Sequence, residues 1–291
     1  MKTTLAIAAA LALVACGAPA EEDDSVAGDS AVIGGKAARV ASVVYLEDGC
    51  TATKVGDGLL LTAAHCVLDA ATVEVFHQPG TTIGVRREPG KPVESLRVAA
   101  VTVHPAWLDA CGRAYCGASE TVSKLDAPDV AVIRVEGLDD VPAMRVPSSS
   151  LAPGDRVQIA GFGCTEGVKI PDARANVTLA AADARIVPPD HALHDGSYIG
   201  KADLEVVAGN VVMTDGPGAS RSRAGLCPGD SGGPLLAKRG SETVVVGVNA
   251  NYTFRPEAKD DKGLPVTNWH TRLDDRSRHA VAAWLRSTGV P

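Results

Sequence analysis

The chain has 291 residues and a formal net charge of −7 at pH 7; 45% of its residues are hydrophobic, 3% aromatic and 22% charged. This composition is typical of a soluble globular protein of one or two domains that can bury a core. The acidic balance argues against broad electrostatic binding to nucleic acid or to an anionic membrane surface. We therefore expect no nucleic-acid partner.

Residues 1–15 predict a signal peptide. Lys2 precedes an apolar run that is too short to anchor the chain across a bilayer. The run ends in LVAC, Leu13 to Cys16, which resembles the bacterial lipobox, where the leader is cut before a cysteine that carries a lipid. An ordinary signal peptide cut nearby is the alternative. We expect an exported lipoprotein of the cell envelope, in the outer membrane or periplasm, that meets the membrane only through a lipid on Cys16.

The seven cysteines support this interpretation, because an exported protein with an odd number leaves one thiol to explain. Lipidation of Cys16 leaves six, enough for three disulfides in an oxidising compartment, although the sequence alone leaves the pairing open. The residues that follow Cys16 are small and acidic. Residues 16–31 are therefore expected to form a lipidated acidic tether or propeptide.

Short apolar or alternating runs follow, separated by Gly, Pro and Asp, and no strand–helix–strand rhythm is present. Together these runs predict an all-β protein. The expected strands are 41–47, 58–64, 71–76, 97–104, 130–135, 156–163 and 242–250. The tail, residues 273–289, predicts a C-terminal α-helix with Asp274 or Asp275 as its N-cap and Gly289 as its stop.

Three motifs carry chemistry. LTAAHC ends an apolar run at His65, and Cys50 before that run could bridge Cys66 and hold the imidazole rigidly. DVAVIRV opens a predicted strand with Asp129, and GDSGGP places Ser231 among glycines. A serine hydroxyl is a poor nucleophile at neutral pH, so it needs an imidazole base, which a carboxylate can orient.

In this order, the three motifs resemble those of the trypsin-like (chymotrypsin-fold) serine peptidases. The resemblance implies that His65 is the general base, Asp129 its orienting partner and Ser231 the nucleophile, with an oxyanion hole made by the N–H groups of Gly229 and Ser231. The substrates would be proteins or peptides, cleaved through an acyl-enzyme. No cofactor or metal is expected, and the oligomeric state is not determined by the sequence.

The resemblance also implies two six-stranded antiparallel β-barrels with the site in their cleft. We expect one peptidase domain over 32–291, with the N-terminal barrel at 32–146 and the C-terminal barrel and helix at 147–291. The segment SAVIGGKAA looks like the activation site of this family. A cut before Val32 would create an α-ammonium group that pairs with Asp230 and would release the peptidase from its anchor. A simple turn before the first strand is the alternative.

The remaining cysteines are expected to pair as Cys111 with Cys116, a local loop bridge, and Cys164 with Cys227. Metal binding is the weaker alternative for the first pair. The second pairing follows from the resemblance, which makes the two loops neighbours at the oxyanion hole. It departs from the usual family pattern, because no cysteine follows Cys227.

Substrate preference is expected to be for small or neutral P1 residues. In the resembled family the residue six before the nucleophile lies at the bottom of the pocket, and an acid there selects Lys or Arg. Here that residue is Gly225, so a basic side chain would be left unpaired. Tyr252 is expected to form the pocket wall and make the pocket shallow.

Two other functions are alternatives to a peptidase. A catalytically silent binding protein of the same fold is possible because fold does not fix function. An esterase on an α/β-hydrolase fold would need strands that alternate with helices, and the sequence shows no such alternation.

Overall fold

A computed structural model describes residues 32–69, 72–88, 91–113, 127–164, 178–193, 201–217, 224–254 and 265–291. The predicted leader and tether, including Cys16, and the predicted Cys111–Cys116 bridge lie outside the described residues. None of the helices in the described part of the chain combines the length and apolar character needed to cross a bilayer.

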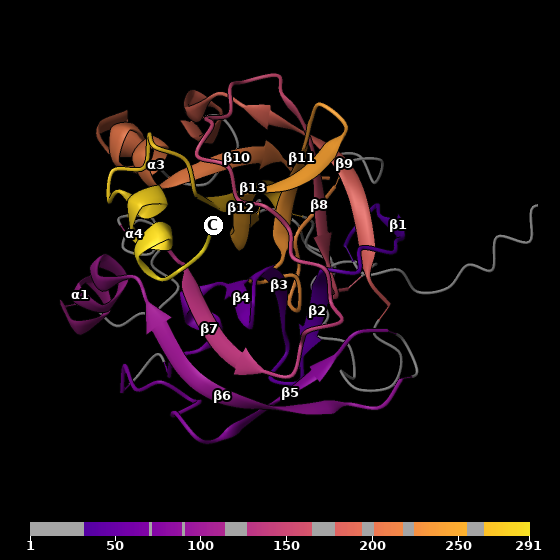
Figure 1. Cartoon of the computed structure of the whole chain (residues 1–291). Coiled ribbons are helices and arrows are strands. Elements are labelled where there is room, and N and C mark those ends of the chain that lie inside the picture. The colour runs from indigo at the N-terminus through magenta and orange to yellow at the C-terminus, as the bar shows by residue number, and fades with distance from the viewer. Residues whose placement is uncertain are drawn as a thin grey trace, which may run out of the picture.

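The first half of the chain forms a closed antiparallel barrel with the strand order β2-β3-β4-β7-β6-β5 (Figure 1). Strands β2 to β4 are buried along their whole length; the apolar sequences of β2 and β4 predict this, whereas β3 also buries Thr51, Thr53 and Lys54. The strands are β2 (Val43–Leu46), β3 (Cys50–Gly56), β4 (Leu59–Thr62), β5 (Thr82–Arg86), β6 (Glu94–Val103) and β7 (Ala131–Glu136).

The strand expected over 71–76 is wrong. In the described part of that run, only Val75 forms a β-bridge, an isolated one with Leu68. Val73 and Val75 pack against the apolar core of the first barrel, but Val73 has φ of 59°, which lies outside the extended region that a strand requires.

The second half also closes, through the order β9-β10-β13-β12-β11-β8 and the additional β8–β9 pairing. The predicted fold class, two six-stranded antiparallel barrels, is confirmed. The strands are β8 (Arg156–Gly161), β9 (Ala180–Val187), β10 (Val211–Asp215), β11 (Pro234–Arg239), β12 (Glu242–Phe254) and β13 (Pro265–Arg272). A short strand β1 (Lys36–Ala37) pairs with β9, so the start of the predicted peptidase domain is attached to the second barrel.

The helices are short and lie outside the barrels (Figure 1). They are α1 (Pro105–Arg113), α3 (Leu204–Asn210) and α4 (Val281–Ser287), with 3-10 turns at Ala64–Cys66, Pro189–Leu193 and Lys201–Asp203. Helix α4 is the predicted C-terminal helix, and Val281 and Leu285 bury its apolar face. The expected acidic N-cap is wrong: α4 starts after Ala280, and Asp274 instead forms a buried ion pair with Arg272.

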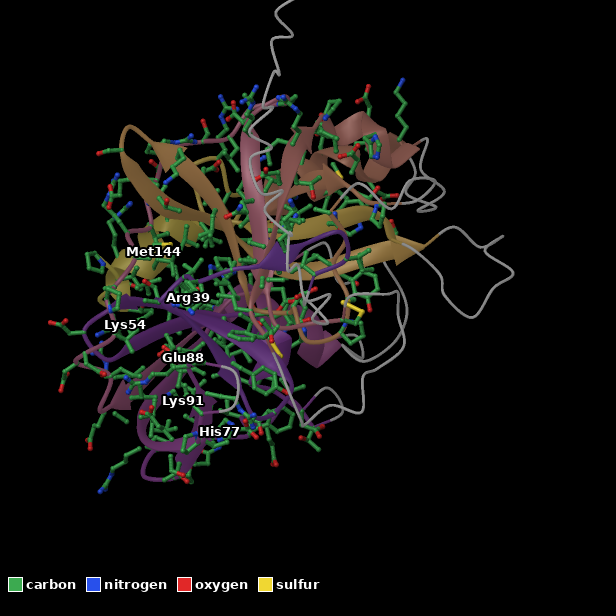
Figure 2. The ribbon with its side chains drawn as sticks, turned by 90° about the vertical axis from the view of Figure 1, so that its right-hand side faces the viewer. Arg39, Lys54, His77, Glu88, Lys91 and Met144 are labelled. Carbon is green, nitrogen blue, oxygen red and sulfur yellow. A yellow bond between two sulfur atoms is a disulfide. The ribbon has the colours of Figure 1, made fainter. Side chains whose placement is uncertain are left out.

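A buried lysine fastens the segment that leaves the first barrel. Lys54 on β3 is 3% exposed, and its ammonium group donates to the carbonyl oxygens of Leu138 and Val141 at 2.5 and 2.6 Å. The N–H of Met144 in turn donates to the carbonyl of Lys54 at 2.8 Å (Figure 2). These bonds attach residues 138–144 to β3 of the first barrel, at the start of the segment that leads to the second barrel.

The largest apolar cluster crosses the boundary between the barrels. It joins first-barrel side chains with Phe162, Leu236 and Val248 of the second barrel. The Tyr45 and Phe162 rings lie 5.8 Å apart between centroids. The barrels therefore share a core, which fixes the strand ends that face each other across it.

Candidate active site

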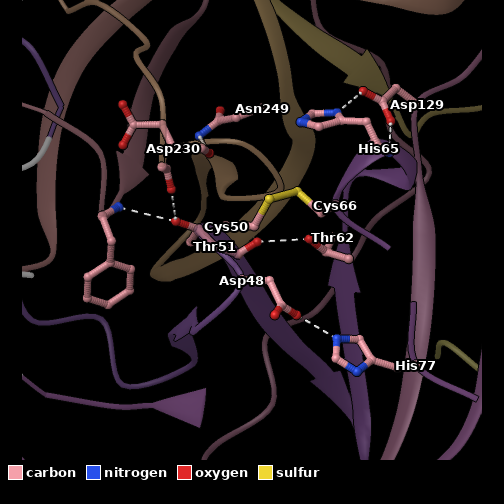
Figure 3. Close-up of a disulfide and its surroundings, with 12 residues drawn as sticks. Asp48, Cys50, Thr51, Thr62, His65, Cys66, His77, Asp129, Asp230 and Asn249 are labelled. Atoms are coloured by element: carbon pink, nitrogen blue, oxygen red, sulfur yellow. Dashed lines mark hydrogen bonds and ion pairs between the residues drawn. A yellow bond between two sulfur atoms is a disulfide. The ribbon is translucent and has the colours of Figure 1, made fainter. Parts of the chain in front are cut away.

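His65 and Asp129 come from neighbouring strands of the first barrel. His65 lies in the 3-10 turn after β4, and Asp129 lies just before β7; these strands pair with Thr62 opposite Ala131. The backbone N–H of His65 donates to Asp129 Oδ1 at 3.0 Å, and His65 Nδ1 lies 2.6 Å from Asp129 Oδ2 (Figure 3). Because an ionised carboxylate only accepts, Nδ1 carries a proton, and in the neutral form of the ring Nε2 therefore keeps its lone pair. The ring is 37% exposed and the carboxylate 7%.

A side chain from the second barrel also holds Asp129. The hydroxyl of Thr271 on β13 donates to the backbone carbonyl of Asp129 at 2.8 Å. Both groups are buried, so water competes little for this bond. The orienting acid is thus fastened from both barrels.

Ser231 is joined to the His65 region by a short path. The N–H of Thr51 donates to the carbonyl oxygen of Ser231 at 2.8 Å. Thr51 directly follows Cys50, which forms a disulfide with Cys66, the neighbour of His65. Gly232 is packed so closely on Thr51 and the β4 end that an added Cβ would collide with them. The predicted serine loop therefore sits on the strand ends that carry the imidazole.

The backbone around Ser231 presents two N–H groups without partners. Within the described ranges, neither the Gly229 nor the Ser231 N–H donates a hydrogen bond. Gly229 has φ of 100°, and an added Cβ would lie 2.8 Å from the Gly163 Cα, so only glycine fits this turn. Two adjacent donors of this kind suit an oxygen that acquires negative charge.

Thr51 fixes this turn and was missed by the sequence analysis. Its buried hydroxyl donates to the carbonyl of Gly229 at 2.8 Å and accepts the Phe162 N–H at 3.2 Å. Its carbonyl accepts the Thr62 hydroxyl at 2.9 Å (Figure 3). Its position next to Cys50 was the only signal of this role.

Asp230 is completely buried beside the turn. Its carboxylate accepts the Gly163 N–H at 2.8 Å and the Cys227 N–H at 3.0 Å. Burial raises the pKa of Asp230 to about 7, although both N–H bonds act in the opposite direction. A carboxylate in this environment is stabilised by any cation that reaches it.

The VIGG segment lies against the same loops. Ile33 and Gly225 exchange two backbone hydrogen bonds of 3.0 Å, and the Ile33 side chain packs on Cys164 and Cys227. Val32 is fully buried. The residues after the predicted cut are therefore docked next to the peptide groups that hold Asp230.

Comparison with known proteins agrees with this geometry. The family model described as Trypsin matches residues 26–265. The chain belongs to the trypsin family. Members of this family are serine endopeptidases. Human kallikrein-7 is 25% identical over 232 residues, which cover 78% of each chain. Phenoloxidase-activating factor 3 of Holotrichia diomphalia is 23% identical over 210 residues, covering 66% of this chain and 52% of that protein.

This trypsin-family chain has the two disulfides among its described residues that the sequence analysis paired, Cys50–Cys66 and Cys164–Cys227. The second joins the end of the segment after β8, where the Gly163 N–H binds Asp230, to the loop that contains Asp230 and Ser231. Cys50, Cys66 and His65 place potential metal-ligand atoms within 4.8 Å of one another. Both sulfurs are bonded to each other, however, so they offer no thiolate to a metal.

The predicted pocket residues Gly225 and Tyr252 of this trypsin-family chain border the same apolar cluster. A Cβ on Gly225 would lie 2.7 Å from the Pro217 ring and 3.2 Å from the Ile33 Cβ. Tyr252 packs on the apolar cluster that contains Ala224 and Leu226, which flank Gly225. Burial and the negative charge of Asp230 raise the pKa of Tyr252 to about 12. The phenol therefore stays neutral.

Proposed function

We propose that this chain is a serine endopeptidase that hydrolyses peptide bonds through an acyl-enzyme. The observation that supports it most directly is the pairing of His65 with Asp129 beside a serine loop whose Gly229 and Ser231 N–H groups lack partners in the described structure. A neutral imidazole with Nε2 unprotonated is the form that a general base requires.

In the proposed reaction, the Ser231 hydroxyl attacks the carbonyl carbon of the scissile bond while His65 Nε2 takes its proton. The tetrahedral intermediate collapses when the imidazolium returns that proton to the leaving amine, and an ester to Ser231 remains. Water, deprotonated by the same imidazole, then attacks the ester, and the second product leaves as the imidazolium returns the proton to the Ser231 oxygen. Asp129 keeps the imidazole in the required tautomer and stabilises its charged form.

The proposed oxyanion hole consists of the Gly229 and Ser231 N–H groups. Donors of this type contribute about 3–4 kcal/mol each to transition-state stabilisation in comparable sites. The contribution depends on a fixed turn, and Thr51 and the Cys164–Cys227 disulfide both hold this turn.

The proposed P1 preference is for small or neutral side chains. No acid lies at position 225, and the Pro217 ring leaves no room for one there. A lysine or arginine at P1 would be buried without a counter-charge, which is strongly unfavourable.

We also propose that the protein is made as a zymogen, exported and lipid-anchored at Cys16. A cut before Val32 would place an α-ammonium near the loops around Asp230, whose pKa is raised by burial. The same cut would separate the peptidase from residues 16–31 and free it from the membrane.

Labelling with a fluorophosphonate tests the proposal. Its phosphorus accepts the Ser231 oxygen and fluoride leaves, so the cut form should be labelled and the Ser231→Ala variant should not. A folded, correctly cut protein that fails to label would refute the peptidase and favour a silent binding protein of this fold. Peptide profiling of the labelled form then tests the preference: dominant cleavage after Arg would contradict it.

A further inference from the structure

A buried chain of hydrogen bonds runs through the second barrel. Its side chains are Asn268 and His270 on β13, Thr214 on β10 and Asn249 on β12, and all four are 0% exposed. One end of the chain meets residues 224–226 and the other meets the serine loop. Because residues 224–226 form the pocket floor only under the proposed function, the inference rests on it.

At the pocket end, the Asn268 side chain forms hydrogen bonds with the backbone on both sides of Gly225. Its Oδ1 accepts the Leu226 N–H at 2.8 Å, and its Nδ2 donates to the Ala224 carbonyl at 2.9 Å. The same Nδ2 lies 3.0 Å from the Thr214 hydroxyl. The floor is thus held by one amide side chain.

At the other end, Asn249 holds the serine loop. Its Nδ2 donates to the carbonyl of Asp230 at 3.2 Å and to that of Ala160 at 3.0 Å. Its backbone carbonyl accepts the Gly232 N–H, and its N–H donates to Gly233, both at 2.8 Å. Asn249 therefore contacts both sides of Ser231.

The donors and acceptors fit in one direction only. Because the amide nitrogen of Asn249 faces two carbonyls, its Oδ1 faces His270 Nδ1 at 2.9 Å, and that nitrogen must carry the proton. His270 Nε2 then accepts from the Thr214 hydroxyl at 3.1 Å, and the Thr214 oxygen accepts from Asn268. Burial lowers the pKa of His270 to about 3, so the ring is neutral.

We propose that Thr214 and His270 are positioning residues that set the pocket floor relative to the serine loop and thereby determine which P1 side chains are accepted. Neither residue contacts the proposed oxyanion hole directly. Each acts through an asparagine, Thr214 through Asn268 at the floor and His270 through Asn249 at the loop.

The test replaces Thr214 with valine, which has the same shape without the hydroxyl, and with serine, which keeps the hydroxyl. Thr214→Val leaves His270 Nε2 buried without a donor. We expect kcat/KM to fall about five-fold or more for substrates with alanine or valine at P1. Substrates with glycine at P1 and the rate of fluorophosphonate labelling should change less than about two-fold, since Asn249 still holds the loop. Thr214→Ser should restore the wild-type preference.

Thr53→Val is the matched control, because Thr53 is also a buried strand threonine and its hydroxyl has no partner in the described structure. An equal loss for all P1 residues, or no loss, in Thr214→Val would overturn the positioning role while leaving the peptidase intact. Failure of the wild type to label would instead refute the peptidase. In that case 15N NMR of the His270 ring still tests the hydrogen-bond chain. A ring protonated at Nε2 would show that the chain does not have the proposed direction.

Discussion

Replacing Thr51 with valine should weaken both the fold and the proposed oxyanion hole. The change keeps the β-branched shape that a buried β3 position favours and removes only the hydroxyl. That hydroxyl donates to the Gly229 carbonyl at 2.8 Å and accepts the Phe162 N–H at 3.2 Å. Both backbone groups lose a partner at once, and a valine methyl group takes the oxygen's place.

The cost follows from the two groups that are left. A buried polar group without a partner costs about 1–3 kcal/mol. The Phe162 N–H is buried, whereas the Gly229 carbonyl is partly buried and can recover some hydration. We therefore expect Thr51→Val to lower the free energy of unfolding by about 2–4 kcal/mol.

Denaturant unfolding of the disulfide-intact protein measures this loss, and the fluorophosphonate labelling rate measures its effect on Ser231. Thr51→Ser should keep most of both. Thr53→Val, two residues along the same strand, removes a buried hydroxyl that has no partner in the described structure, so it should lower neither the free energy of unfolding nor the labelling rate. If Thr51→Val behaves like Thr53→Val, the hydroxyl does not hold the Gly229 turn and the reasoning is wrong.

Three further outcomes are expected. Gly225→Asp should not create cleavage after Arg, because its Cβ would meet Pro217 at 2.7 Å; peptide profiling would show the opposite if the pocket were open there. Burial lowers the pKa of His104 to about 4, so the unfolded chain binds a proton that the native state lacks, and stability should fall as pH drops from 6.5 towards 4. The unfolding free energy should lose up to about 1.4 kcal/mol per pH unit relative to His104→Gln. For Asp230 the sign reverses: with a native pKa of about 7 against 3.8, the stability of the uncut Ser231→Ala protein should fall as pH rises through this range. Melting curves of the uncut and cut forms should then diverge towards neutral pH; parallel curves would argue against an α-ammonium reaching this carboxylate.

The sequence predicts an all-β chain because strands depend on local patterns, and the two barrels and the chemistry follow from the resemblance of its three motifs to a known family. Apolar runs bounded by turn residues predict strands wherever one face is buried. His65, Asp129 and Ser231 stand in sequence motifs, and the residues next to them in these motifs are also restricted by backbone conformation and packing. Gly229, for example, is required by a positive φ and by the nearness of Gly163.

The contacts that hold these residues could not be predicted in the same way. Thr51 and Thr271 look like ordinary strand threonines, and only the packing of one barrel on the other places them beside Gly229 and Asp129. The prediction of Asp274 as a helix N-cap was wrong for a related reason. An aspartate before a helix can cap it or form an ion pair, and here Asp274 forms a buried ion pair with Arg272. Long-range partners are set by topology, which a local pattern does not contain.

The path between the imidazole and the serine runs through very few bonds. The Cys50–Cys66 disulfide ties the start of β3 to the turn that carries His65, and the next residue, Thr51, bonds to Ser231 through its N–H. The relative position of base and nucleophile thus depends on one disulfide and one strand end. Substitutions deep in either barrel disturb this path only when they shift this strand end. The residues to test for catalysis are therefore those that surround Thr51, not the larger apolar residues that account for most of the stability.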